Sequence, residues 1–352
     1  MGTQSTKPGG ETEPIDAPQS LVGRVVDGRY RLDESIDIGG MGIIFRAEQI
    51  STGRRVAVKV LKPSRADEVD LVQRFEREAE VLTRISHPNI VSLVDSGTDA
   101  GGLSYVALEF VDGATFRHVL KRGHLSLIEI VEVFAKTTSA LAEAHAADVI
   151  HRDLKFDNVM VSRQADDHLC VTVLDFGVAK PMAEGGGLEL TRKGQVPGTP
   201  SIVAPELVDE QPPTPQSDLY SLGVLLFTAL TGEPPFEGDN DLELMRAHKQ
   251  DDLPPVRDRV PRYVPDSLVS LTEGLLAKSP DHRPESARTV RRDLDAVRRE
   301  LWELPIEGHP YAPNDPGPEE FQKYSSRADR TPVDGGDGSR DVPGWVQSFF
   351  DE

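Results

Sequence analysis

Residues 151–158, with the sequence HRDLKFDN, contain side chains suited to proton transfer and cation binding. Asp153 has a carboxylate that can orient a hydroxyl group and accept its proton. Asn158 and, further along, Asp175 offer the oxygen ligands that Mg²⁺ prefers. Each of the three lies in a turn beside a short apolar run, where side chains can converge. The ordinary alternative is that these are unrelated polar turn residues. The occurrence, in this order, of HRDLKFDN with its Lys155 and of Asp175-Phe176-Gly177 argues against that alternative.

A predicted strand carries Lys59 among apolar residues, in the sequence VAVKV. Burying an ammonium group is costly unless an anion pairs with it. The helix predicted over residues 67–85 offers Glu78 as that anion. Glu76 and Glu80 are rivals, but the 3.6-residue period places Glu78 with the apolar residues on the inner face. We therefore expect an ion pair between Lys59 and Glu78.

A glycine-rich turn over residues 37–42 precedes this strand and contains Gly39, Gly40, Met41 and Gly42. Glycines let backbone N–H groups approach phosphate oxygens closely. A glycine-rich turn by itself indicates no more than a hairpin. A loop that binds phosphate groups is the functional hypothesis for this turn.

The blocks occur in the order of, and resemble, those of the bacterial Hanks-type Ser/Thr protein kinases. The resemblance covers about residues 28–301 and includes Gly198-Thr199-Pro200 and Ala204-Pro205-Glu206. It implies an α+β, bilobal protein-kinase fold, with a small β-rich N-lobe holding one main helix and a larger helical C-lobe. It also implies transfer of the γ-phosphoryl group of ATP to Ser or Thr hydroxyls of protein substrates. Mg²⁺ is the implied metal, with Mn²⁺ as a substitute.

The resemblance assigns a role to each motif. Lys59, braced by Glu78, would hold the α- and β-phosphates. Asp153 and Lys155 would act at the attacking hydroxyl, and Asn158 and Asp175 would bind the metal. Leu108 would precede the hinge between the lobes. The ATP-binding residues would be Ile36, Gly39, Gly40, Met41, Gly42, Ile44, Ala57, Lys59, Glu109, Val111 and Met160.

Other implied roles are structural or regulatory. Thr199 would bond Asp153 and Lys155, a pairing that resembles Ser/Thr rather than Tyr kinases. In the C-lobe, Glu206 would pair with Arg283, and Asp218 would accept hydrogen bonds from the backbone of residues 151–153.

Arg152 would receive a phosphate on the activation segment, residues 175–206. Thr191 is the candidate phosphorylation site because it lies eight residues before Thr199, beside two basic residues. An unmodified, mobile segment is the alternative, and Gly185-Gly186-Gly187 is compatible with it.

The sequence departs from the family pattern at two positions. Asp37 stands where the pattern has its first glycine, and we expect weaker ATP affinity rather than lost activity. Ile202 stands where the family commonly has tyrosine, which affects the shape of the substrate-docking loop. These departures favour one alternative, a pseudokinase scaffold that binds nucleotide without transfer. A small-molecule phosphotransferase is a third hypothesis, which the segments at 198–200 and 204–206 disfavour.

The hydrophobic pattern and turn residues predict the elements that position these groups. Predicted strands are 30–36, 43–49, 55–61, 90–95, 103–110, 159–162 and 170–174; helices are 67–85, 126–147 and several within 218–301. The second helix begins with a capping-box pattern, Ser126 and Glu129. We predict a disordered lead at 1–26, a kinase domain at 27–302 (N-lobe 27–109, C-lobe 113–302) and a Pro/Gly/Asp-rich tail at 303–352.

The composition limits the partners. A net charge of -20, from 39 basic and 59 acidic residues, argues against nucleic-acid binding, which needs clustered cations. Cys170, the single cysteine, excludes an internal disulfide and is predicted to be buried. We expect no membrane span, no secretory signal and a cytoplasmic location. Beyond protein substrates, we consider a homodimer and a partner docked on the tail aromatics Trp345, Phe349 and Phe350.

Overall fold

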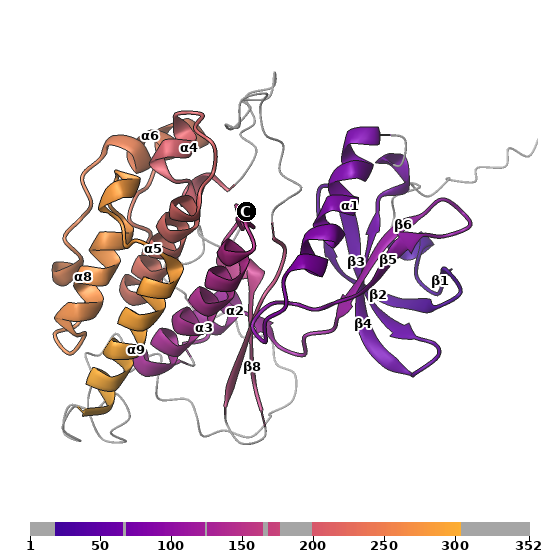
Figure 1. The fold of residues 1–352 in the computed structure, drawn as a ribbon, viewed down its shortest axis with the longest axis horizontal. Helices are drawn as coiled ribbons and strands as arrows, with labels where there is room; N and C mark the ends of the chain where they lie inside the picture. The colour runs from indigo at the N-terminus through magenta and orange to yellow at the C-terminus, as the bar shows by residue number, and fades with distance from the viewer. Residues whose placement is uncertain (1–17, 66–67, 124, 165–167, 177–198, 304–352) are drawn as a thin grey trace, which may run out of the picture.

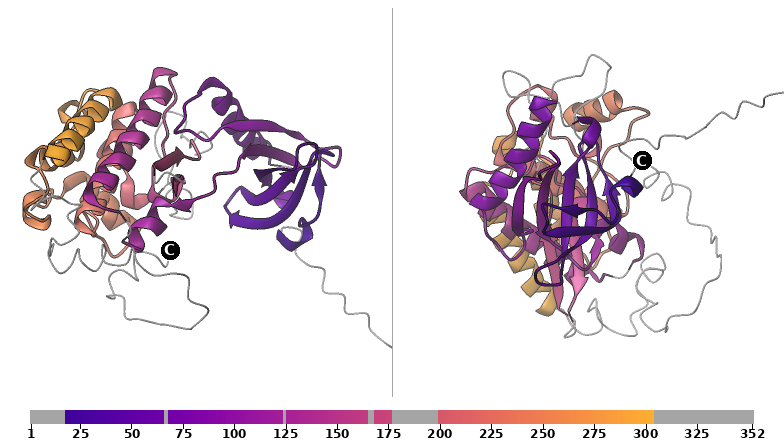
Figure 2. Two further views of the ribbon diagram at one scale, coloured as in Figure 1. Left: turned by 90° about the horizontal axis from the view of Figure 1, so that it is seen from below. Right: turned by 90° about the vertical axis from the view of Figure 1, so that its right-hand side faces the viewer.

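The computed structural model describes residues 18–65, 68–123, 125–164, 168–176 and 199–303. Figure 1 shows a β-rich N-lobe with a single long helix beside a larger C-lobe built mainly from helices. The left view of Figure 2 shows the two lobes side by side, and the right view looks along the long axis with the N-lobe in front. This is the predicted bilobal α+β arrangement.

The N-lobe is an antiparallel sheet with the strand order β1-β2-β3-β4-β6-β5 among the described residues. Helix α1 packs beside β5 and brings one acidic residue, Glu78, to the sheet. The elements are β1 (Val25–Val26), β2 (Tyr30–Ile38), β3 (Gly42–Gln49), β4 (Arg54–Leu61), α1 (Val69–Arg84), β5 (Leu93–Thr98) and β6 (Ser104–Glu109).

The two faces of this sheet differ in burial. Alternate residues of β3 and β4 are fully buried on one face, including Ile43, Phe45 and Val58. Residues of the other parity, Ile44 and Ala57, are only half-buried. Successive side chains of a strand point to opposite faces. The half-buried face is therefore the one available to a ligand.

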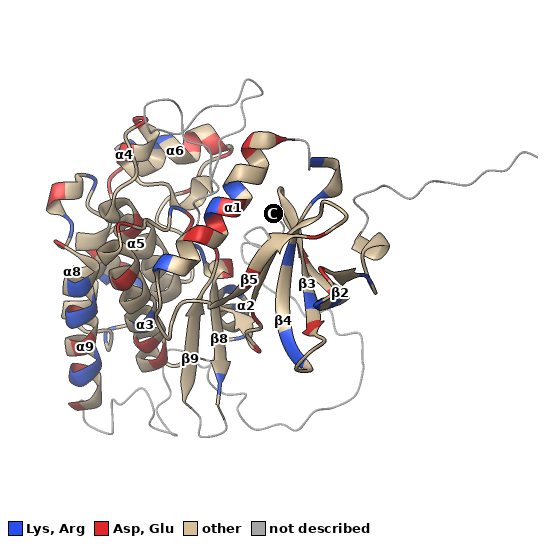
Figure 3. Cartoon of the chain, turned by 45° about the vertical axis from the view of Figure 1, so that its right-hand side comes forward, with Lys and Arg blue, Asp and Glu red and all other residues tan. Residues whose placement is uncertain are grey.

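The C-lobe surrounds a small sheet, β7-β8-β9, with helices. Helix α3 packs against α9 on one side and against β9 and α5 on others. Acidic and basic residues are interspersed along α1 and α9 (Figure 3). The elements are β7 (Ala114–Thr115), α2 (Phe116–Lys121), α3 (Leu127–Ala146), β8 (Val159–Arg163), β9 (Leu169–Val173), α4 (Pro205–Val208), α5 (Pro215–Thr231), α6 (Asp241–Gln250), α7 (Val256–Arg259), α8 (Asp266–Leu275) and α9 (Ala287–Glu303).

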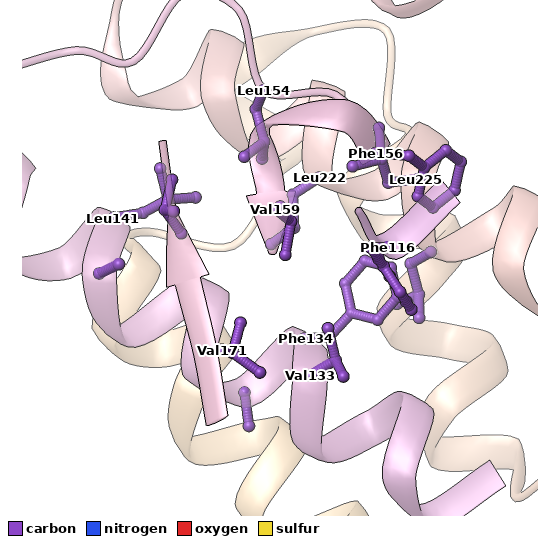
Figure 4. Close-up of a cluster of buried hydrophobic side chains, with 14 of the residues drawn as sticks. Phe116, Val133, Phe134, Leu141, Leu154, Phe156, Val159, Val171, Leu222 and Leu225 are labelled. Carbon is purple, nitrogen blue, oxygen red and sulfur yellow. The ribbon is translucent and has the colours of Figure 1, made fainter. Parts of the chain in front are cut away.

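An apolar cluster anchors the segment that carries Asp153 (Figure 4). Leu154 and Phe156, on either side of Lys155, are 1% and 7% exposed. The Phe116 ring packs edge-on against Phe156 at a centroid distance of 5.4 Å. Burying two such side chains contributes roughly 1.5–3 kcal/mol each. Lys155 between them, and Asp153 directly before them, are held at the surface of this core.

The predicted capping box is present at the start of α3. The Glu129 carboxylate accepts hydrogen bonds from the backbone N–H and the hydroxyl of Ser126, at 2.8 and 2.7 Å. These contacts satisfy a donor that would otherwise be unpaired at the helix N-terminus. The start of α3 thus follows from the local sequence.

Three predictions about elements need correction. The disordered lead was predicted to reach residue 26, but residues 18–26 pack on the sheet. Leu21 is 4% exposed and Val26 is fully buried, and the Arg24 guanidinium lies 2.7 Å from the Asp99 carboxylate. The apolar residues of this stretch, such as Leu21 and Val26, show no helical or strand period long enough to predict the contact, because their burial depends on a surface formed by distant strands.

The strand predicted at 90–95 lies instead at Leu93–Thr98, where it pairs with β6. Ile90 makes only an isolated bridge to Val173. The Asp-Ser-Gly sequence there has weak strand propensity, and pairing at the sheet edge overrides it.

Cys170 is half-exposed rather than buried, since on β9 the alternate residues Leu169, Val171 and Val173 face the core.

Candidate active site

Lys59 and Glu78 form an ion pair across the N-lobe. The Lys59 ammonium lies 2.6 and 2.8 Å from the two Glu78 carboxylate oxygens. The lysine side chain is 13% exposed and the glutamate side chain 5%. Burial by itself would lower the pKa of Lys59, but the nearby carboxylates of Asp175, Glu78 and Asp37 outweigh it and raise that pKa. Lys59 therefore stays cationic with capacity for a further anion.

Glu78 is selected over its neighbours by the geometry of α1. Glu78 is buried on the face shared with Phe75, whereas Glu76 and Glu80 are exposed. The expected pairing partner is thus the one found.

Asp153 lies at the centre of a polar cluster in the C-lobe. The Thr199 hydroxyl donates to its carboxylate at 3.0 Å, and the Lys155 ammonium lies 3.4 Å from the other carboxylate oxygen. The Asn158 amide donates to the Asp153 backbone carbonyl at 2.8 Å. These contacts fix the orientation of a carboxylate whose side chain is 14% exposed.

Asp175 faces the same space from the end of β9. Its carboxylate lies 3.9 Å from the Lys59 ammonium, so it connects the two lobes electrostatically. Asp175 has φ 46°, in the left-handed region that residues with a Cβ rarely adopt. Such backbone strain concentrates at functional sites because the surroundings must hold it.

The donor set around Asn158 and Asp175 suits a magnesium ion. Asn158 uses its amide nitrogen on the Asp153 carbonyl, which leaves its oxygen as the ligand atom. The Asp175 carboxylate is 38% exposed and can be reached by a ligand. Mg²⁺ is commonly held by one or two such oxygen ligands together with substrate phosphates.

Asp218, on α5, holds the segment before Asp153. Its carboxylate accepts the backbone N–H groups of His151 and Arg152, at 2.8 and 2.9 Å. The His145 ring lies 2.8 Å from the same group. Burial alone would raise the pKa of Asp218, but these hydrogen bonds and charges lower it, so the carboxylate is ionised. The anion stabilises a segment in which Arg152 has φ 65°.

The glycine-rich loop closes as a tight turn between β2 and β3. Gly39 N–H donates to the Gly42 carbonyl at 2.9 Å. A Cβ at residue 42 would lie 2.5 Å from the Val60 carbonyl oxygen, so only glycine fits there. Asp37, which stands at the first glycine position of the pattern, is exposed and pairs in register with Ile44.

The predicted base-binding residues come from both lobes, with Ile44 and Ala57 on the half-buried face of the N-lobe sheet and Met160 on β8 of the C-lobe. Ile44 is opposite Lys59 in the β3–β4 register, and Ala57 is opposite Leu108 in the β4–β6 register. Leu108 is buried, at 8% exposed, and Ile36 is 48% exposed. Glu109, Val111 and Met160 are half-buried. An apolar surface next to Lys59 is thus available to a planar ligand.

Glu206 and Arg283 form a buried pair away from this cleft. Two guanidinium nitrogens donate to the two carboxylate oxygens at 2.8 and 2.7 Å. The Arg283 guanidinium also stacks over the Tyr220 ring, 4.9 Å from its centroid. The geometry is bidentate, which is the strong form of this contact. It joins α4 to the segment before α9.

Some predicted residues lie outside the described part of the chain. These are Thr191 with its glycine-rich neighbours, and the tail aromatics Trp345, Phe349 and Phe350. Arg152 is described and half-buried, and burial lowers its pKa.

Sequence reasoning missed residues that support the site. The His151 ring lies 3.0 Å from the Leu174 carbonyl and packs on Phe176 at a centroid distance of 4.7 Å. It therefore links the segment of Asp153 to that of Asp175. Arg65 donates from its guanidinium to the Gly40 carbonyl at 3.0 Å, a contact with the glycine-rich loop that was not predicted. His151 lies inside a recognised motif, directly after the apolar pair Val149 and Ile150, which was a usable signal of burial, whereas Arg65 had no such signal.

Among the described residues, no helix is long and apolar enough to cross a membrane.

The protein kinase domain model matches residues 30–294. The serine/threonine-protein kinase pkn3 of Myxococcus xanthus is 37% identical over 282 residues, which are 79% of this chain and 52% of that protein. PkaA of Streptomyces coelicolor is 37% identical over 286 residues, 78% of this chain and 51% of that protein. PknA of Mycobacterium tuberculosis is 36% identical over 282 residues, which are 79% of this chain and 63% of that protein. The match thus covers only about half of the first two relatives.

Proposed function

The chain belongs to the protein kinase family, and from this premise we propose that it transfers the γ-phosphoryl group of ATP to Ser or Thr hydroxyls of proteins. The observation that carries the proposal is the cluster around Asp153. Thr199, Lys155 and Asn158 all contact Asp153, and Asp175 lies beside the Lys59–Glu78 pair. These side chains offer a carboxylate for the hydroxyl proton, oxygen ligands for a metal and a cation for the phosphates, which supports the proposal.

Asp153 is the proposed catalytic base. Its oriented carboxylate accepts a hydrogen bond from the substrate hydroxyl and takes its proton as the oxygen attacks phosphorus. Lys155, 3.4 Å from this carboxylate, contributes a positive charge where the transferred group passes. Thr199 keeps the carboxylate aimed, at 3.0 Å.

The ATP site is proposed to span both lobes. Lys59 holds the α- and β-phosphates, and Glu78 keeps its ammonium in place. The backbone N–H groups of Gly40 and Met41, at the tip of the glycine-rich loop, would cover the phosphates. The base would lie between the apolar side chains of Ile44, Ala57 and Met160, with Ile36, Glu109 and Val111 beside them.

A divalent cation completes the proposed site. Asn158 and Asp175 would hold it through their oxygens, and the cation would neutralise the charge of the phosphates. We propose Mg²⁺, with Mn²⁺ as a substitute of similar ligand preference.

Autophosphorylation at Thr191 is part of the proposal. A phosphate there would pair with Arg152 and order the activation segment. Phosphosite mapping of active protein tests it, and an unmodified Thr191 would rule it out. Cytoplasmic location, a homodimer and a partner docked on the tail stay predictions from the sequence.

A transfer assay tests the function. The purified full chain is incubated with radiolabelled ATP, Mg²⁺ and a generic basic protein, beside Asp153→Asn and Asp148→Asn. Asp153→Asn should lower transfer by about 10²–10⁴-fold, the usual contribution of a general base. Asp148, an exposed carboxylate with φ 58°, is the matched control and should keep full activity, because Asn tolerates this conformation.

Thermal shift with nucleotide separates the alternatives. Nucleotide binding by all three proteins with label on none would favour the pseudokinase scaffold. Equal label with wild type and Asp153→Asn would exclude Asp153 as the base. Label that requires Asp153 supports the kinase.

A further inference from the structure

Arg65 contacts the tip of the glycine-rich loop from the segment between β4 and α1. It ends a 3₁₀ turn, Pro63–Arg65, which directly follows the strand of Lys59. The guanidinium Nη1 donates to the Gly40 carbonyl at 3.0 Å. Its other nitrogens donate to the two carboxylate oxygens of Glu68, at 2.8 and 3.2 Å. The guanidinium is thus held by Glu68 and aimed at the loop.

Packing contacts do not fix the backbone conformation at the tip of the loop. A Cβ built at Gly40 would meet no atom within 4 Å. Glycine also has wide backbone freedom, so the peptide between Gly40 and Met41 can rotate unless a contact holds it. The Arg65 hydrogen bond is such a contact. The next carbonyl, that of Met41, accepts the Lys62 N–H at 3.1 Å. Two successive carbonyls of the tip are therefore held by one segment.

The orientation of a carbonyl determines that of the adjoining N–H. In a trans peptide the carbonyl oxygen and the N–H of the next residue point in opposite directions. When Arg65 holds the Gly40 carbonyl, the Met41 N–H must point away from Arg65. An N–H directed in this way from a glycine-rich tip is the donor that a phosphate oxygen requires.

We propose that Arg65 is a positioning residue for the phosphates of ATP, acting through the Gly40–Met41 peptide. The inference rests on the proposed function, because it assumes a triphosphate under the loop. Arg65 does not touch the nucleotide in this proposal.

Glu68 extends the effect to helix α1. Glu68 is the N-cap residue of α1, and its backbone carbonyl accepts the N–H groups of Leu71 and Val72. The same helix carries Glu78, the partner of Lys59. The Arg65–Glu68 pair thus fixes the loop relative to the helix that orients Lys59. The phosphate contact of the loop and that of Lys59 are then both positioned by α1.

The test measures binding of ATP·Mg, ADP·Mg and adenosine to the full chain, with KM for ATP and kcat measured in parallel. Wild type is compared with Arg65→Ala, Arg65→Lys and Glu68→Gln. Arg31→Ala is the control, since Arg31 is another exposed arginine of the N-lobe paired with carboxylates, at 3.1 and 2.5 Å. It is not part of the proposed site.

Arg65→Ala should weaken ATP·Mg and ADP·Mg binding about five- to tenfold, the effect of one charged hydrogen bond, and leave adenosine affinity unchanged. KM for ATP should rise with little change in kcat. Arg65→Lys should recover part of the affinity, and Glu68→Gln should show a smaller loss.

Two results would overturn the proposal. One is a KM for ATP in Arg65→Ala equal to that of Arg31→Ala. The other is an equal loss of affinity for adenosine and ATP, which would indicate a general structural defect. Binding does not require transfer, so an inactive wild type would contradict the proposed function while the comparison of affinities still tests Arg65.

Discussion

Asp37 places a carboxylate at the start of the glycine-rich loop. It is exposed, and it is among the acidic groups that raise the pKa of Lys59 against the effect of burial. The same negative charge repels the phosphates that Lys59 would bind. Two like charges near a protein surface interact modestly, and salt weakens them further. The residue should therefore tune affinity without preventing catalysis.

Replacing Asp37 should tighten ATP binding. We expect Asp37→Asn to lower KM for ATP by about threefold, the order of one screened charge interaction, with kcat nearly unchanged. Steady-state kinetics at low salt and at 0.5 M KCl measure it, since the gain should shrink at high salt. Asp37→Gly separates charge from backbone freedom. An unchanged KM in Asp37→Asn would show that the carboxylate does not act on the nucleotide.

The residue types and their spacing predicted many side-chain contacts of the candidate site, but few of its backbone conformations. Helical phase was enough to choose Glu78 over Glu76 and Glu80. The left-handed φ angles of Arg152 and Asp175 could not be predicted, because contacts made elsewhere impose them. The contact of Arg65 with Gly40 joins residues 25 positions apart and has no local signal.

At the level of elements, the buried pair of Glu206 and Arg283 connects α4 with the chain before α9. The guanidinium is fully buried and the carboxylate 5% exposed. Burial would raise the pKa of Glu206, but the Arg283 hydrogen bonds outweigh it and lower that pKa. The charges stabilise each other only while both are present, since one buried ion without its partner is costly.

Removing one partner should destabilise the C-lobe strongly. We expect Arg283→Ala to reduce the free energy of unfolding by about 3–5 kcal/mol. Urea denaturation measures this change. Lys249→Ala, which removes the exposed ion pair of Lys249 with Asp209, is the control and should cost less than about 1 kcal/mol. Similar losses for both variants would contradict the role of burial.

Element boundaries show where local sequence stops being sufficient. The capping box set the start of α3 correctly, because Ser126 and Glu129 act within one turn. The strand near residue 93 and the packing of residues 18–26 were displaced or missed. Both depend on pairing with β2 and β6, whose positions the local pattern does not contain. Local chemistry predicts the ends of helices better than the edges of sheets.

At the scale of the whole molecule, the candidate site combines groups from both lobes, and the mainly apolar interior of the C-lobe also buries a histidine. His248 is fully buried on α6, and its Nδ1 lies 3.0 Å from the Tyr220 hydroxyl. The Lys278 ammonium donates to the His248 carbonyl at 2.7 Å. Burial, reinforced by the charge of Lys278, lowers the pKa of His248 from 6.5 to about 4. A neutral imidazole is thus built into the lobe that supports the segment at Pro200–Ile202.

This histidine should make stability depend on pH. Its pKa is lower in the folded state, so below pH 6.5 the unfolded chain binds the proton first and stability falls with pH until about pH 4. The shift corresponds to about 3 kcal/mol over that window. Asp218 and Glu206, whose pKa values are lowered, lose their contribution only below about pH 4.

Urea denaturation of wild type and His248→Gln between pH 7 and pH 4.5 measures the effect. The variant should start less stable at pH 7, because a buried contact is changed, and should lose less stability on acidification. Burial also lowers the pKa of His151, so wild type and variant share that remaining slope. Exposed His118→Gln should keep the wild-type slope. If His248→Gln and wild type lost stability in parallel, the buried imidazole would not be the group that senses pH in this range.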